Sequence, residues 1–116
     1  MRELSNHLIG VDQGDRVLFS DFEDDGEMWT GQGQRERRLY TPFSAPFRSI
    51  PVVHVSLSLW DVDTETPLRA VVLADSITKN GFDIVFRTWG DTRVARVSVA
   101  WLAFGELPQE DDWNIY

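Results

Sequence analysis

The chain holds few side chains that could carry out a catalytic reaction. It has two histidines, His7 and His54, and no cysteine, so it can form neither a thiolate nucleophile nor a cysteine metal site. It contains no G-x-S-x-G turn, no G-x-x-x-x-G-K phosphate loop and no H-E-x-x-H pair. His54 precedes Ser56 and Ser58 at a spacing of two, which would put a base and a hydroxyl on one face of a strand. The same spacing is typical of an ordinary polar strand face, and we expect no enzyme activity.

An acidic segment has part of the oxygen spacing of a calcium loop. Asp21, Glu23 and Asp25 alternate along it, and Gly26 follows, as ligands and glycine do at positions one, three, five and six of an EF-hand. The twelfth position holds Gln32 in place of the bidentate glutamate, and no helical pattern flanks the segment. We therefore expect a solvated acidic loop without a bound metal.

One tryptophan, Trp89, is placed to bind a ligand through its ring. If Phe82, Ile84 and Phe86 face the core, Trp89 falls on the opposite face at the strand end, beside Gly90, which has no side chain to cover it. A partly exposed indole beside charged groups suits a pyranose, whose apolar face stacks on the ring while its hydroxyls bond to the charged neighbours. Packing of Trp89 in a subunit interface explains the pattern equally well.

The composition describes one acidic domain. In 116 residues, nineteen acidic and eleven basic side chains give a formal net charge of −8, which repels nucleic acid and anionic lipid surfaces. No stretch approaches the roughly 20 apolar residues of a membrane-spanning helix, and no signal segment stands out. We expect no nucleic acid partner, no membrane insertion and synthesis in the cytoplasm, with release or surface attachment by a non-classical route left open.

Apolar residues alternate with polar ones, which predicts an all-β domain. In residues 52–60, every second residue from Val53 to Leu59 would face the core and Trp60 would face outward. Strands over residues 68–76 and 82–89 would join through Asn80-Gly81, the dipeptide that favours a type I′ hairpin turn. Gly90-Asp91 suits a type II′ turn into a strand over residues 93–104, whose Val97, Val99 and Trp101 would face the core. These last three strands are predicted to form an antiparallel meander.

The remaining segments complete a single domain. Residues 1–34 are predicted to hold an N-terminal strand, drawn from short candidates over residues 8–11 and 16–19, and an acidic loop over residues 21–34. Another strand is predicted over residues 37–41. The sandwich would span residues 35–105. The acidic tail, residues 106–116, would be a flexible end or a docking segment.

A set of motifs over residues 35–105 resembles one protein family. In chain order they are Phe43-x-x-Pro46-Phe47, Pro51-Val52-Val53, Ser56-Leu57-Ser58 with Asp61, Leu68-Arg69, Ile77-Thr78 with Gly81-Phe82, Thr88-Trp89 with Thr92, and Val99-x-Trp101. Their order and spacing resemble the H-type lectin domain of snail agglutinins and slime-mould discoidins. This resemblance implies a six-stranded antiparallel β-sandwich that binds galactose or N-acetylgalactosamine without calcium or another cofactor. It also implies assembly as a homotrimer or a dimer of trimers.

The resemblance also implies residues of a sugar site. Arg69 matches the family arginine that bonds to sugar hydroxyls, and Trp89 matches the tryptophan that lines the site. Gly90 stands where snail agglutinins have a histidine, so Asp91, one residue later in the same turn, is a candidate acceptor in its place.

A second departure concerns the family's acidic residue, which falls near Gln32 or Gly33 in this chain. Gln32 is a candidate here, because either end of its amide could bond to a hydroxyl. The family places its site at a subunit junction, which would put Ser56, Ser58, Arg96 and Ser98 around a threefold axis. The prediction is a non-catalytic lectin domain for a cell-surface glycan. The alternative is a trimeric assembly protein that keeps the fold without binding sugar.

Overall fold

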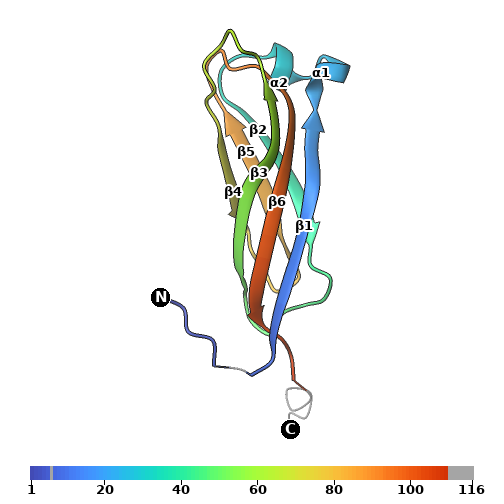
Figure 1. Cartoon of the computed structure of the whole chain (residues 1–116), viewed down its shortest axis with the longest axis vertical. Helices are drawn as coiled ribbons and strands as arrows, with labels where there is room; N and C mark the ends of the chain where they lie inside the picture. Colours follow the sequence, from blue (N-terminus) through green and yellow to red (C-terminus); the bar gives the residue numbers. More distant parts are fainter. Residues whose placement is uncertain (6, 110–116) are drawn as a thin grey trace.

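Six antiparallel strands form two sheets that face each other (Figure 1). The computed structural model describes residues 1–5 and 7–109. Its elements are β1 (Ile9–Ser20), α1 (Asp21–Asp24), α2 (Glu27–Thr30), β2 (Arg35–Pro42), β3 (Val52–Val62), β4 (Val71–Asp75), β5 (Gly81–Thr88) and β6 (Val94–Glu106). One sheet has the order β1-β6-β3 and the other β2-β5-β4. This confirms the predicted antiparallel sandwich of six strands.

The core lies between the two central strands, β5 and β6. Their inward residues are Phe82, Ile84 and Phe86 in β5 and Val97, Val99 and Trp101 in β6, all of them buried. Inward residues occupy every second position, as the alternation of a strand requires. The rings of Phe82 and Trp101 also pack edge to face across the sandwich, with centroids 5.4 Å apart. The inward faces predicted for these two strands are confirmed.

The predicted meander of three strands is wrong. β5 pairs with β2 and β4, whereas β6 pairs with β1 and β3, so Gly90 and Asp91 carry the chain from one sheet to the other. They therefore do not form the predicted type II′ hairpin. Gly90 does adopt a positive φ of 70°, which glycine reaches without steric strain. The error arises because an alternating pattern marks the inward face of a strand but does not say which strand it pairs with.

The predicted hairpin between β4 and β5 exists, but its turn is not type I′. Residues 76–80 make the connection, and Ser76, with a φ of 51°, has the positive φ that was expected at Asn80. The Thr78 hydroxyl accepts hydrogen bonds from the backbone N–H groups of Asn80 and Gly81. Gly81 already belongs to β5, where Tyr40 occupies the space that a side chain would need.

The N-terminal segment is more regular than predicted. The short strands expected over residues 8–11 and 16–19 are parts of the single strand β1, which has a register shift between Val17 and Phe19. The loop expected over residues 21–34 contains the short helices α1 and α2. Within the described part of the chain, no helix is long and apolar enough to cross a membrane.

A bulge in β3 changes which residues face outward. The register shifts between Leu57 and Leu59, so that Leu59 lies opposite Ser98 and is 38% exposed. The predicted inward position of Leu59 is therefore wrong. β4 is also shorter than the predicted strand over residues 68–76, because its ladder with β5 begins at Val71.

The start of β1 and the end of β6 lie together at the end of the sandwich away from the two helices (Figure 1). The N–H of Leu107 donates a hydrogen bond of 2.9 Å to the carbonyl of Leu8. The turns that follow β3 and β5 lie at the opposite end of the sandwich, with α1 and α2 (Figure 1). Most of the acidic tail predicted over residues 106–116 lies outside the described residues.

Candidate functional site

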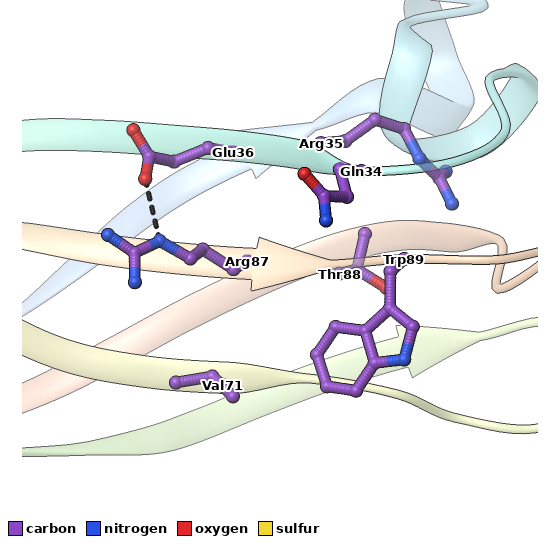
Figure 2. A pocket seen from close by; sticks show the side chains of 7 residues that line it. All are labelled: Gln34, Arg35, Glu36, Val71, Arg87, Thr88 and Trp89. Atoms are coloured by element: carbon purple, nitrogen blue, oxygen red, sulfur yellow. Dashed lines mark hydrogen bonds and ion pairs between the residues drawn. The ribbon is translucent and has the colours of Figure 1, made fainter.

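A groove of about 600 Å³ lies on the outer side of the β2-β5-β4 sheet, near the end that carries the helices (Figure 2). The groove is lined by Gln34, Arg35, Glu36, Val71, Arg87, Thr88 and Trp89. Small-molecule sites usually have volumes of about 300 to 1,000 Å³ and combine an apolar wall with a few polar groups. This groove has both features and is the candidate site.

The apolar wall of the groove is formed by Trp89 and Val71. Trp89 directly follows β5, whose alternation buries Thr88 and turns the next side chain outward. Its side chain is 43% exposed, and Val71 is 40% exposed. Figure 2 shows the six-membered ring of Trp89 turned toward Val71. The wall presents a ring edge and face to anything that enters the groove.

The polar side of the groove is a cross-strand ion pair. The register of β2 and β5 places Glu36 opposite Arg87, and Arg87 Nε donates to Glu36 Oε1 at 2.7 Å. Arg38 Nε lies 3.6 Å from the other carboxylate oxygen. The hydrogen bond from Arg87 is the main cause that lowers the pKa of Glu36 below its ordinary value. Glu36 is therefore ionised at neutral pH.

Arg35 fixes the loops around the groove. It is 6% exposed, and Figure 2 shows its guanidinium turned away from Glu36. The guanidinium donates to five backbone carbonyls: Gly33, Glu27, Met28, Gly90 and Thr92, at 2.8 to 3.3 Å. One side chain thus ties α2, the loop before β2 and the turn after β5 together. The sequence analysis missed Arg35, because nothing in its neighbours indicates acceptors up to 57 residues away.

The structure brings Arg69 and Asp91 together beside the turn that carries Trp89. Arg69 Nη1 donates to Asp91 Oδ1 at 2.6 Å and to the Thr92 hydroxyl at 3.2 Å. The bond from Arg69 is the main cause that lowers the pKa of Asp91 below its ordinary value. A side chain at Gly90 would come within 3.1 Å of Arg69 Nη1, so the missing Cβ leaves room for the guanidinium.

Of the four residues predicted for the site, Trp89 lines the groove, whereas Arg69, Asp91 and Gln32 do not. Arg69 and Asp91 flank the same turn as Trp89. Gln32 is exposed and lies in the loop that is held to this turn by a hydrogen bond from the N–H of Gly33 to the carbonyl of Gly90. The amide that reaches the groove is that of Gln34. Sequence analysis could have found it only by extending the outward alternation of β2 from Glu36 back to Gln34, just before the strand begins.

The acidic segment serves the fold. Asp21 is buried, which corrects the expectation of a fully solvated loop. Its carboxylate pairs with Arg37 at 2.8 Å and accepts the N–H of Met28 at 3.0 Å, so it stabilises the start of α2. Over residues 1–5 and 7–109, no group of three histidine or carboxylate side chains could hold a metal ion.

Comparisons with known proteins identify similar chains and folds. Residues 39–104 match the sequence model of the H-type lectin domain. The protein "ATP synthase subunits region ORF 7" of Fuscovulum blasticum is 54% identical over 107 residues, which cover 92% of this chain and 93% of that protein. Discoidin-2 of Dictyostelium discoideum is 29% identical over 107 residues, 89% of this chain and 38% of its own length.

Two solved structures of discoidin II from the same organism share the fold. They have TM-scores of 0.75 and 0.76 at 24% identity, over 90% of this chain and 40% of the discoidin chain. The chain thus spans nearly the whole of the Fuscovulum protein but about two-fifths of the discoidins.

Proposed function

Because the chain belongs to the H-type lectin domain family, we propose that it binds a cell-surface glycan without catalysing a reaction. The observation that carries this proposal is the exposed ring of Trp89 in a groove whose other wall is the ionised pair Glu36 and Arg87. The proposed ligand is a galactose-like or N-acetylgalactosamine-like sugar.

The groove offers two kinds of contact to a sugar. The apolar face of a pyranose would stack on Trp89 and Val71, where ring burial supplies free energy but little directional selectivity. Its hydroxyls would bond to Glu36, Arg87 and the amide of Gln34, and bonds to the charged groups are the stronger ones. The ring holds the sugar, and the polar groups distinguish one sugar from another.

A second set of contacts is proposed beside the groove. Asp91 lies in the same turn as Trp89, and Arg69 bonds to it from the segment before β4. The loop that contains Gln32 is bonded to this turn through Gly33. In this proposal Arg69 donates to a hydroxyl, and Asp91 accepts in place of the family histidine. Gln32 supplies the bond that an acidic residue makes in snail agglutinins.

Trimerisation through the β1-β6-β3 sheet is part of the proposal. Its outer face has small residues at the centre, Ser56, Ser98 and Ala100, while Val11 and Val17 in β1 are 69% and 68% exposed. Small central residues allow close approach of another sheet, and burial of exposed valines stabilises the contact. Several linked sites would then raise a weak affinity by about 10² to 10⁴-fold in avidity.

A glycan array read at several protein concentrations tests the function. We expect binding to a coherent set of glycans that share one terminal sugar, followed by saturable heat in a calorimetric titration with that sugar. If circular dichroism shows that the protein is folded and no glycan gives saturable binding, the proposal is contradicted.

The assembly protein remains the second candidate, because one observation favours it. Arg69 is already engaged by Asp91 and Thr92, which leaves less of its donor capacity for a sugar, while the outer face of the β1-β6-β3 sheet keeps its exposed valines. A trimer that binds no glycan on the array would identify this second function.

A further inference from the structure

The groove has more free hydrogen-bond donors than free acceptors. Both oxygens of Glu36 already face arginines, Oε1 toward Arg87 and Oε2 toward Arg38. Arg87 uses only its Nε in this pair, and its two Nη atoms have no protein partner among residues 1–5 and 7–109. The amide of Gln34 likewise makes no hydrogen bond to the described part of the chain. These free N–H donors favour a ligand group that brings acceptors.

The lining is also positive in an otherwise acidic protein. Arg35 and Arg87 contribute two positive charges and Glu36 one negative charge, which leaves one positive charge in excess, while the chain as a whole has a net charge of −8. The charge of Arg35 is offset only by carbonyl dipoles, because all five of its bonds go to backbone oxygens. Local charge of this sign favours an anion, and the positive charge within its reach is that of Arg87, because the guanidinium of Arg35 is buried.

We propose that the groove binds an anionic substituent, a carboxylate or a sulfate, on a sugar of the glycan. The sugar ring would lie against Trp89 and Val71, and the two Nη atoms of Arg87 would hold the anion. Figure 2 shows these parts at opposite ends of the groove, with the guanidinium near Glu36 and the indole beside Val71. A guanidinium binds carboxylate and sulfate oxygens through paired N–H donors, which a single ammonium cannot reproduce. This inference rests on the proposed function and specifies its ligand class.

Calorimetric titrations with three sugars test the inference. The ligands are methyl galactoside, methyl galacturonide and methyl galactoside 6-sulfate, which share a ring and an aglycone and differ in the substituent at carbon 6. At low salt we expect at least one of the two anionic sugars to bind about three- to ten-fold tighter than the neutral one, a modest gain because Arg87 is half exposed. The gain should shrink at about 1 M salt, where the Debye length falls to about 3 Å.

Two variants should shift the preference in opposite directions. Arg87→Gln removes the donor and should abolish the preference for the anionic sugar. Glu36→Gln removes the competing carboxylate and should enlarge the preference. The control is Arg48→Gln, which removes one charge from a side chain of similar exposure, 46% against 48%. It pairs with Glu106 outside the groove and should leave the preference unchanged.

The results separate the inference from the proposed function. If neutral and anionic sugars bind equally, the anion site is overturned and the lectin function stands. If no sugar binds to the folded protein, both fail. If the preference survives in Arg87→Gln, Arg87 is not the anion's partner and the proposal is overturned. A preference for only one of the two anions supports it and identifies the substituent.

Discussion

Arg35 is the side chain on which the geometry of the loops around the groove depends. Its five donors are matched by five carbonyls, whereas a lysine has three donors on one atom. Arg35→Lys keeps the charge but leaves buried carbonyls unpaired, at about 1 to 3 kcal/mol for each group that water cannot reach. We expect a loss of roughly 2 to 4 kcal/mol in the free energy of unfolding, measured by urea denaturation.

Arg38→Lys is the control for this prediction. Arg38 is 37% exposed and bonds to the carboxylates of Asp75 and Asp83 at the surface, so the exchange should cost less than about 1 kcal/mol. If Arg35→Lys and Arg38→Lys lower the free energy of unfolding equally, the carbonyl bonds of Arg35 stabilise the fold no more than the surface ion pairs of Arg38 do.

Trp89 provides the exposed ring of the proposed sugar site. Trp89→Ala removes the stacking surface and should weaken glycan binding by about 1 to 3 kcal/mol, or roughly five-fold to over a hundred-fold. Calorimetry with a sugar identified on the array measures the loss. Trp60→Ala is the matched control, because Trp60 is 56% exposed in β3 and does not line the groove. A binding loss shared by both variants would place the sugar elsewhere.

At the scale of the elements, substitution of two glycines in the loops beside the groove distinguishes the effect of backbone strain from the effect of a steric contact with Arg69. Gly33 and Gly90 have φ values of 79° and 70°, and an alanine pays about 1 to 2 kcal/mol in that conformation. A Cβ at Gly33 meets nothing within 4 Å, whereas one at Gly90 meets Arg69 Nη1 at 3.1 Å. Both variants should unfold at lower urea concentration.

Only Gly90→Ala should bring a new side chain against Arg69. We expect Gly90→Ala alone to weaken glycan binding several-fold, because the displaced guanidinium leaves its place beside Asp91. Calorimetric affinity measured on both variants decides this. Unchanged binding in Gly90→Ala would remove Arg69 from the proposed second set of contacts.

The local part of the fold could be predicted from the sequence. Inward residues of β5 and β6 were correct because alternation is a property of a single strand. Pairing was not, because β1 meets β6 across most of the chain, with Ile9 opposite Glu106, and no short motif encodes such a partner. The bulge before Leu59 was also missed, since one extra residue leaves no mark in an apolar segment.

The candidate site was predictable to the same extent. Trp89 could be found, because strand alternation turns it outward after Thr88. Glu36 and Arg87 could not, because they become neighbours only through the register of β2 and β5. From the sequence alone, Arg35 would be taken for a charged surface residue. Only the structure shows that carbonyls from three separate segments surround it.

For the whole molecule, the first expectation is a trimer at micromolar concentration. Ala100→Arg puts a long charged side chain at the centre of the outer β1-β6-β3 face and should yield a monomer by light scattering. Tyr40→Arg changes a residue that is 54% exposed in the other sheet and should leave the trimer intact. A wild-type protein that is monomeric at this concentration would sink the proposed assembly.

The second expectation concerns acid. Hydrogen bonds from arginines lower the pKa values of Glu36, Asp75 and Asp91 in the folded protein. At acid pH the folded chain therefore binds fewer protons at these three carboxyls than the unfolded chain does. Their contribution to stability is complete above the ordinary carboxyl pKa, near pH 4, and is lost as the pH falls through the lowered values. At a pH above this range, protonation of some carboxylates already reduces the net charge of −8, which weakens the repulsion between negative charges in the folded protein.

Scanning calorimetry between pH 7 and pH 2 at constant ionic strength checks this balance. We expect Tm to hold or rise slightly as the pH approaches the sequence pI of about 4.5 and to fall below about pH 4. A steep fall already between pH 7 and pH 5 would require a titrating group other than these three carboxyls.

The place of β6 at the centre of its sheet also determines the order in which the molecule can be made on the ribosome. β1 and β3 pair only with β6 in that sheet, yet β6, over Val94–Glu106, is synthesised after all the other strands that the structure describes. The β2-β5-β4 sheet has all its strands once residue 88 has emerged. Until β6 has emerged, β1 has no partner strand in this sheet, and its backbone edges and apolar residues are open to chaperones and to other nascent chains. Among the described strands, the nascent chain is therefore most vulnerable just before β6 appears.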